Sequence, residues 1–185
     1  MALLEIETKI KINNVAKLRK KIKKIAKLNK KEIRNDEYFA IKRKFRKNKY
    51  PKKAFRIRNN GKGYIINFKK WLTKYWDKDI VVKEEFEFKV EDLKSFLELT
   101  KDLGFIPWIK KIKKTESYKY NQDKKITLEI NNVKHLGYFL EIEYLGKKNE
   151  IRKTKEKIRK ILKELEIDKK QIDNTGYTKM LWKKS

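Results

Sequence analysis

The stretch Leu3-Leu4-Glu5-Ile6-Glu7-Thr8-Lys9-Ile10-Lys11-Ile12 alternates almost strictly between aliphatic and charged residues. Successive side chains of an extended strand point to opposite faces, so this period of two predicts a β-strand with two unlike faces. One face is aliphatic, and the other carries two glutamates followed by two lysines. The fold hypothesis starts from this charged face, because the same pattern returns later in the chain.

Pairs of like charges recur at a spacing of two, which places both members of a pair on one face of a strand. These pairs and the single charges at comparable places are Arg56 with Arg58, Glu85 with Glu87, Glu141 with Glu143, Lys69 and Glu129. On any single strand, solvation of one wet face explains such charges. Over six strands the pattern favours a shared charged interior, because like charges side by side weaken a strand.

The other segments predict short strands with helices between them. Helical spacing of apolar residues covers 15–25, 90–103 and 151–165, and strand patterns cover 33–42, 54–58, 63–71, 81–89, 107–120, 125–130 and 138–144. With the first segment this makes eight strands, which can close into a barrel with a small lumen. We expect an α+β fold, an eight-stranded antiparallel β-barrel with helices packed on the outside, as a single domain over residues 1–185.

The composition excludes several classes of function. Cysteine is absent, so disulfides and thiolate metal sites are excluded. The one histidine, His135, cannot by itself build a histidine zinc site, and its position in a predicted turn between strands argues against Ser-His-Asp catalysis. No apolar run approaches the ~18 residues needed to span a bilayer, and the N-terminus does not resemble a secretion signal. We expect a soluble, cytoplasmic protein without a membrane partner.

The formal charge of +28 arises from 53 Lys and Arg against 25 Asp and Glu. Such an excess attracts polyanions, including nucleic acid and phosphorylated small molecules. Lysines are spread along nearly every segment, which suggests a general compositional bias. Nucleic acid is therefore allowed as a partner but not favoured, and a homodimer is also compatible with the sequence.

Clustered carboxylates constrain what the charged interior can bind. They repel one another by about 1 kcal/mol per pair in water and by several-fold more in a partly desolvated lumen. A cation between them makes the cluster tolerable, and an all-oxygen site suits Mg²⁺ or Mn²⁺. Arginine offers bidentate donors to phosphate, and lysine offers a compact charge. Acidic and basic side chains in one lumen predict a site for metal and polyphosphate.

Glu5-Ile6-Glu7-Thr8-Lys9 resembles the Glu-x-Glu-x-Lys signature of the CYTH superfamily, the triphosphate tunnel metalloenzymes. Further landmarks follow in the family's order, at 36–39, 55–58, 66–69, 85–87, 103–105, 128–133 and 137–143. The likeness runs from Glu5 to about Leu181. It departs from the family at Lys113-Lys114-Thr115, where members usually carry Lys-x-Arg, so that one arginine is missing.

The resemblance implies a role for each charged position. The implied metal ligands are Glu5, Glu7, Glu129, Glu141 and Glu143, among which Glu7, Glu141 and Glu143 are the catalytic candidates. The implied triphosphate-binding residues are Lys9, Arg56, Arg58, Lys69, Lys113 and Lys114, with Glu85 and Glu87 as further tunnel carboxylates. The implied cofactor is Mg²⁺ or Mn²⁺.

The resemblance also implies a metal-dependent enzyme, either a class IV adenylate cyclase-like lyase or a triphosphate hydrolase. The substrate would be ATP, inorganic triphosphate or thiamine triphosphate. The chain length and the tail Tyr177-Thr178-Lys179-Met180-Leu181 look closest to the cyclase branch. The alternative is a non-catalytic protein that binds polyphosphate or RNA, which the net charge and the missing arginine motivate.

Overall fold

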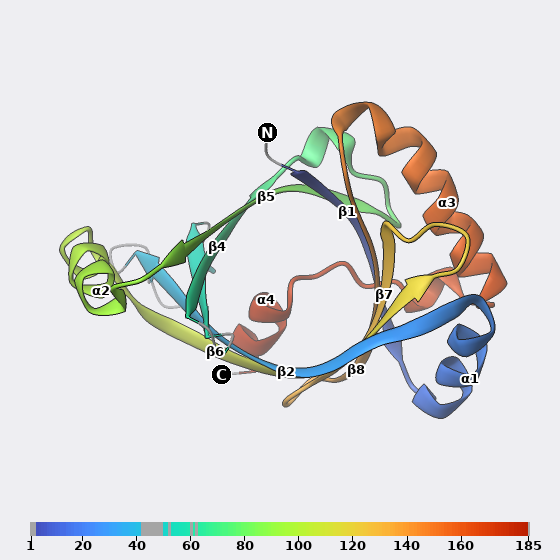
Figure 1. Cartoon of the computed structure of the whole chain (residues 1–185), viewed down its shortest axis with the longest axis horizontal. Helices are drawn as coiled ribbons and strands as arrows, with labels where there is room; N and C mark the ends of the chain where they lie inside the picture. The colour runs from blue at the N-terminus through green and yellow to red at the C-terminus, as the bar shows by residue number, and fades with distance from the viewer. Residues whose placement is uncertain (1–2, 42–49, 52, 60, 62, 185) are drawn as a thin grey trace. The chain divides into compact units, whose positions relative to one another are not determined.

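The computed structural model describes residues 3–41, 50–51, 53–59, 61 and 63–184. Within these residues eight strands form a closed barrel in the order β1-β5-β4-β3-β2-β6-β7-β8 (Figure 1). The strands are β1 Leu3–Ile12, β2 Ala26–Ile41, β3 Ala54–Asn59, β4 Tyr64–Trp71, β5 Val81–Val90, β6 Phe105–Tyr120, β7 Ile126–Val133 and β8 Gly137–Gly146. The helices are α1 Val15–Ile25, α2 Leu93–Asp102, α3 Ile151–Glu164 and α4 Tyr177–Trp182. The predicted eight-stranded antiparallel barrel is confirmed.

The chain forms two compact parts. The first part comprises residues 1–33, 70–85 and 113–174, and the second part comprises residues 34–69, 86–112 and 175–185. No helix in the described ranges is both long enough and apolar enough to cross a bilayer.

In the first part, helices α1 and α3 cover one face of the sheet. Figure 1 shows α3 (orange) alongside this sheet. The covered face and the helices share a core of fully buried aliphatic side chains, among them Ile6, Ile10, Ile22, Ile130, Leu140, Ile142, Ile158 and Ile161. Because side chains alternate along β1, the charged residues of β1 lie on the opposite, inner face of the barrel.

The second part has its own smaller core. Phe39, Ile57 and Ile66 are buried there and pack against Phe96 of α2. The rings of Phe39 and Phe55 stack with their centroids 5.2 Å apart. The helix starts later than the predicted 90–103, since the Asp92 side chain accepts a hydrogen bond from the backbone N–H of Ser95 and caps it.

Strand β2 differs most from its prediction. It begins at Ala26, immediately after α1, whereas the sequence pattern predicts a strand from 33. Residues 27–31 are exposed on both sides of the strand. Apolar and polar residues alternate along a strand only where one of its faces is buried. The sequence of this half of β2 therefore does not alternate and did not predict a strand.

Leu140→Ala should lower the free energy of unfolding by about 2–5 kcal/mol, because Leu140 is fully buried and its truncation leaves a cavity. The matched control is Leu145→Ala on the same strand, where the side chain is 41% exposed. Urea unfolding measures both. Equal losses for the two variants would contradict the assigned inner and outer faces of β8.

Candidate active site

Three glutamates come together on the inner face of β1 and β8. The register pairs Glu7 directly with Glu143, and carboxylate oxygens of Glu5, Glu7 and Glu143 lie within 4.8 Å of one another. Glu5 and Glu7 are only 3% and 6% exposed. Buried carboxylates at this spacing repel strongly, so the group needs neighbouring positive charge and could hold a divalent cation.

Lys83 of β5 supplies part of that charge, and the sequence analysis missed it. Its ammonium group donates a hydrogen bond to Oε1 of Glu7, and the strand register pairs Lys83 with Glu5. The same ammonium lies 5.5 Å from the centre of the Trp71 ring. Lys83 is two residues before Glu85, so it lies on the same charged face of β5. This spacing could have predicted Lys83 as a site residue.

A second pair of glutamates is held by Lys113 of β6. The Lys113 ammonium lies 3.3 Å from Oε2 of Glu129 and 3.3 Å from Oε2 of Glu141, which are paired across β7 and β8. Lys9 stands opposite Glu141 in the register. Burial lowers the pKa of Lys9, against the attraction of Glu141 and Glu7, which raises it.

A neutral hydrogen-bond chain occupies the place of the missing family arginine. Thr115, 2% exposed, lies 2.7 Å from Oδ1 of Asn131 and donates its hydroxyl to it. Asn131 in turn donates its side-chain N–H to Oε2 of Glu141 at 2.7 Å. Neither residue was predicted as part of the site, because neither is ionisable. Together with Lys113 they fix the Glu141 carboxylate.

In the second part, Asp36 is the centre of a cluster of cations. Arg58 donates two hydrogen bonds to its carboxylate, at 2.6 and 3.0 Å. The Lys111 ammonium lies 2.9 Å away, and Nε of Arg56 lies 3.9 Å away. Burial alone would raise the pKa of Asp36, but the charges of Lys111, Arg58 and Arg56 outweigh it and hold this pKa well below its usual range.

Two further contacts complete the cluster around Asp36. Lys111 also donates a hydrogen bond to the hydroxyl of Tyr38 at 2.9 Å. Burial would raise the pKa of Tyr38, yet the Lys111 charge lowers it overall. Glu87 accepts hydrogen bonds at 3.1 Å from Arg56 and at 3.1 Å from Asn67. Asp36 and Lys111 were not predicted as site residues, although Lys111 is a like charge at a spacing of two from Lys113.

The structure sorts the predicted residues into two groups. The first part brings together Glu5, Glu7, Lys9, Lys113, Glu129, Glu141 and Glu143, and the second part brings together Arg56, Arg58 and Glu87. Lys69 and Glu85 are half-buried. Each follows an inner-face residue by two positions, Lys69 after Asn67 and Glu85 after Lys83, so each shares the face of that residue. Lys114 is a correction to the prediction. It is exposed and adjacent to the buried Lys113 along β6, so it lies on the opposite face.

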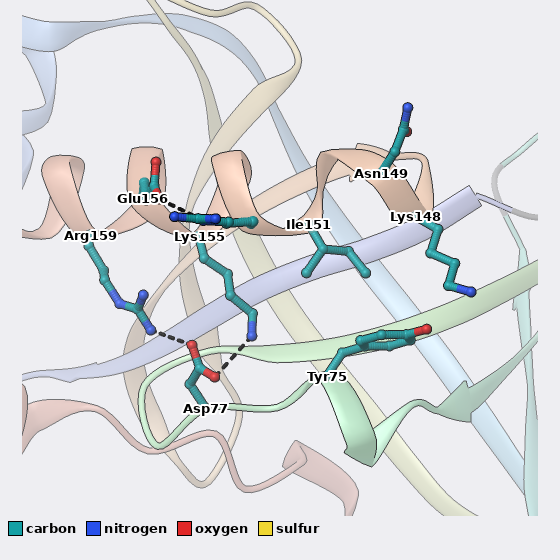
Figure 2. Close-up of a pocket in the computed structure, with 9 residues that line it drawn as sticks. Tyr75, Asp77, Lys148, Asn149, Ile151, Lys155, Glu156 and Arg159 are labelled. Carbon is teal, nitrogen blue, oxygen red and sulfur yellow. Dashed lines mark hydrogen bonds and ion pairs between the residues drawn. The ribbon is translucent and has the colours of Figure 1, made fainter.

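A groove beside α3 contains a separate cluster of charges (Figure 2). Arg159 donates hydrogen bonds to the two carboxylate oxygens of Asp79 at 2.8 and 2.9 Å and also contacts Asp77. The Lys155 ammonium lies 3.0 Å from Asp77. These contacts join the β4–β5 connection to α3 and neutralise Lys155 and Arg159. The ion pairs in the groove therefore hold the segment before β5 against α3.

Acidic and basic side chains on the inner face of a closed antiparallel barrel define a class of protein that handles multivalent charged ligands. The CYTH domain family model matches residues 3–177. The chain belongs to the CYTH family.

The chain is similar along its length to several archaeal proteins. A Methanocaldococcus jannaschii protein named "Putative adenylate cyclase" is 34% identical over 183 residues, covering 96% of this chain and 98% of that protein. A solved structure from Pyrococcus horikoshii is 28% identical with a TM-score of 0.76, covering 98% of this chain and 99% of that chain. A conserved hypothetical protein from Pyrococcus furiosus is 28% identical with a TM-score of 0.74, covering 95% and 98%.

Asp36→Asn should lower the free energy of unfolding at pH 7 by roughly 3 kcal/mol, because it leaves buried cations without their counter-charge. Below about pH 4 the unfolded chain protonates Asp36 while the folded chain does not, so wild-type stability falls as the pH drops. The variant should lose this part of the slope. Urea unfolding from pH 2.5 to 7 measures how the free energy of unfolding depends on pH for both proteins. This range includes the usual pKa of an aspartate, about 4.

The control is Glu37→Gln, whose side chain is 38% exposed beside Lys110. It should cost less than about 1 kcal/mol and keep the wild-type pH slope. An Asp36→Asn variant with an unchanged slope would contradict the assigned pKa direction.

Proposed function

We propose that the protein is a divalent-metal-dependent enzyme that cleaves a phosphoanhydride bond of a triphosphate. The observation that carries this proposal is the group of Glu5, Glu7 and Glu143 within 4.8 Å of one another in a chain of the CYTH family. The similarity to a protein named "Putative adenylate cyclase" supports ATP as the first substrate to test. Inorganic triphosphate and thiamine triphosphate are the other two.

The donor set fits Mg²⁺ or Mn²⁺. Carboxylate oxygens are the ligands that these hard cations prefer, and both ions keep waters and phosphate oxygens in their remaining positions. Glu5, Glu7 and Glu143 would hold the ion, and Glu129 and Glu141 are the further proposed ligands. When bound, the ion would neutralise phosphate charge and polarise the phosphorus–oxygen bonds.

Each part has its own candidate cations for phosphate oxygens. Lys9 and Lys113 would bind them in the first part, and Arg56, Arg58 and Lys69 in the second. Arg58 is held by two hydrogen bonds to Asp36, so its guanidinium is already oriented and loses little rotamer freedom on binding.

Glu141 is the residue best placed to accept a proton from the attacking oxygen. Asn131 and Lys113 fix its carboxylate on one oxygen, Oε2, so the direction of the other oxygen is also fixed. Attack by water on the terminal phosphorus would give diphosphate and phosphate. Attack by a ribose 3′-hydroxyl on the α-phosphorus would give a cyclic nucleotide and pyrophosphate.

Incubation with each of the three triphosphates and Mg²⁺ or Mn²⁺, followed by chromatography of the products, tests this function. Cyclic AMP with pyrophosphate identifies a cyclase, and released phosphate identifies a hydrolase. Turnover of none of the three would contradict the proposal. The second candidate function, non-catalytic binding of polyphosphate, is favoured by the neutral Thr115–Asn131 pair in place of an arginine. It predicts binding without turnover.

Glu7→Gln should reduce kcat by at least about 100-fold while the variant remains folded, because it removes one charge from the metal-holding group. Steady-state assays with the preferred triphosphate measure the loss, and circular dichroism checks the fold. The matched control, Glu84→Gln, changes a carboxylate on the other face of β5 and should retain activity within about twofold. Retained activity in Glu7→Gln would argue against the proposed site.

Lys83→Met should bind Mn²⁺ about tenfold more tightly than wild type, because the Lys83 ammonium competes with a cation for Glu7. Calorimetric titration with Mn²⁺ alone measures this without any substrate. Lys89→Met, at the exposed end of β5, is the control and should not change the affinity. Weaker Mn²⁺ binding by Lys83→Met would show that Lys83 supports the ion instead of competing with it.

A further inference from the structure

Helix α1 and the first half of β2 form a strongly basic surface in the first part. Residues 17–31 contain nine basic residues and no acidic residue. Seven of these side chains are exposed. Lys30 pairs with Glu32, and we call the other six the α1 ridge: Lys17, Lys20, Lys23, Lys24, Lys27 and Lys31. The sequence analysis attributed the high net charge to a general bias, but the structure concentrates part of it here.

The six lysines fall into two sets, four on α1 and two on β2. With 3.6 residues per turn, the four on α1 fall within about a third of the helix circumference. They lie opposite the buried Leu18 and Ile22. Lys27 and Lys31 are four residues apart in an exposed stretch of β2, so they share one face of that strand. Since β2 follows α1 without a connecting loop, the helix and strand lysines are also close together along the chain.

Helix α3 shows that lysine-rich composition alone does not explain the exposed, unpaired lysines of the α1 ridge. Five cations of α3 have carboxylate partners within 4 Å, namely Arg152, Lys155, Lys157, Arg159 and Lys160. Throughout the described ranges, by contrast, no carboxylate lies within 4 Å of the ammonium group of a ridge lysine. Compositional bias would charge both helices alike. Five of the seven cations of α3 are in ion pairs, whereas within the described residues no ridge lysine is.

Two acidic groups near the ridge are already paired with other cations. Glu116 pairs with Arg19 at 2.7 Å, and Glu166 pairs with Lys21 at 2.8 Å. The hydrogen bond from Lys21 lowers the pKa of Glu166, and the charges of Lys17 and Lys24 lower it further. The ridge lysines therefore project a positive potential onto neighbouring groups, as a surface that attracts polyanions must.

We propose that the α1 ridge is a docking surface for double-stranded nucleic acid, which it binds through the phosphates without sequence preference. Lysine ammonium groups neutralise phosphates and release counterions, which supplies most of non-specific affinity. Residues 15–33 contain no aromatic side chain on which unpaired bases could stack, which argues against a single strand. Their one arginine, Arg19, is paired with Glu116, so no arginine is free to read base edges. This inference is independent of the proposed enzymatic function.

The proposal is tested by fluorescence anisotropy with labelled DNA and RNA duplexes of about 20 base pairs, titrated with protein at several salt concentrations. A duplex of this length offers more phosphates than the ridge can contact. The test variant neutralises four ridge positions together, Lys20→Gln, Lys23→Gln, Lys24→Gln and Lys27→Gln. It should bind at least about tenfold more weakly than wild type, and the slope of log K against log salt should become shallower by roughly 3 to 4. If only one duplex type responds, the ridge binds that type of nucleic acid.

The matched control neutralises four exposed lysines elsewhere, Lys94→Gln, Lys134→Gln, Lys153→Gln and Lys163→Gln, and so has the same net charge as the test variant. It should keep nearly wild-type affinity and slope. Equal losses in both variants would overturn the proposal in favour of net charge alone, and so would absence of duplex binding by wild type at low salt.

Two further arms locate the binding. Glu7→Gln should bind duplex as wild type does, and the ridge variant should keep wild-type triphosphate turnover, because the ridge is separate from the inner face. Loss of duplex binding in Glu7→Gln would place the nucleic acid in the barrel and overturn the proposal. Stronger binding to vesicles of anionic lipid than to either duplex, lost in the ridge variant, would overturn it in favour of a membrane surface.

Discussion

Repulsion between buried carboxylates is the constraint on which the first part depends. Glu7 and Glu143 face each other across β1 and β8, and Glu5 lies close to both. The protein meets this constraint by placing lysines from neighbouring strands against the glutamates, as the Lys83 contact with Glu7 shows. Internal lysines of this kind stabilise the folded chain. They also compete with any divalent ion for the same carboxylates.

The second part solves the opposite problem with the same chemistry. There the excess charge is positive, and the buried carboxylate of Asp36 holds Arg58 and Lys111 in place. An acidic centre surrounded by cations keeps the guanidinium groups oriented. The two parts therefore use complementary arrangements, one with glutamates held by lysines and the other with basic groups held by an aspartate.

Much of this architecture could be predicted from periodicity. The strict alternation of β1 predicted both its bounds and its charged face, because one face is buried under helices. The first half of β2 was missed because both of its faces are exposed. The carboxylates that Lys83 and Lys111 contact could not be predicted, because these contacts depend on which strands are neighbours in the barrel. Thr115 and Asn131 carry no charge, so only the structure could reveal their contact with Glu141.

The central claim is that the inner glutamates hold a divalent ion. Anomalous diffraction at the manganese edge, from crystals grown with Mn²⁺ and inorganic triphosphate, tests it most directly. The account predicts an anomalous peak within coordination distance of Glu5, Glu7 and Glu143, with triphosphate density beside it. Ordered triphosphate density with no anomalous peak near these three glutamates, their carboxylates still paired with lysine, would contradict it.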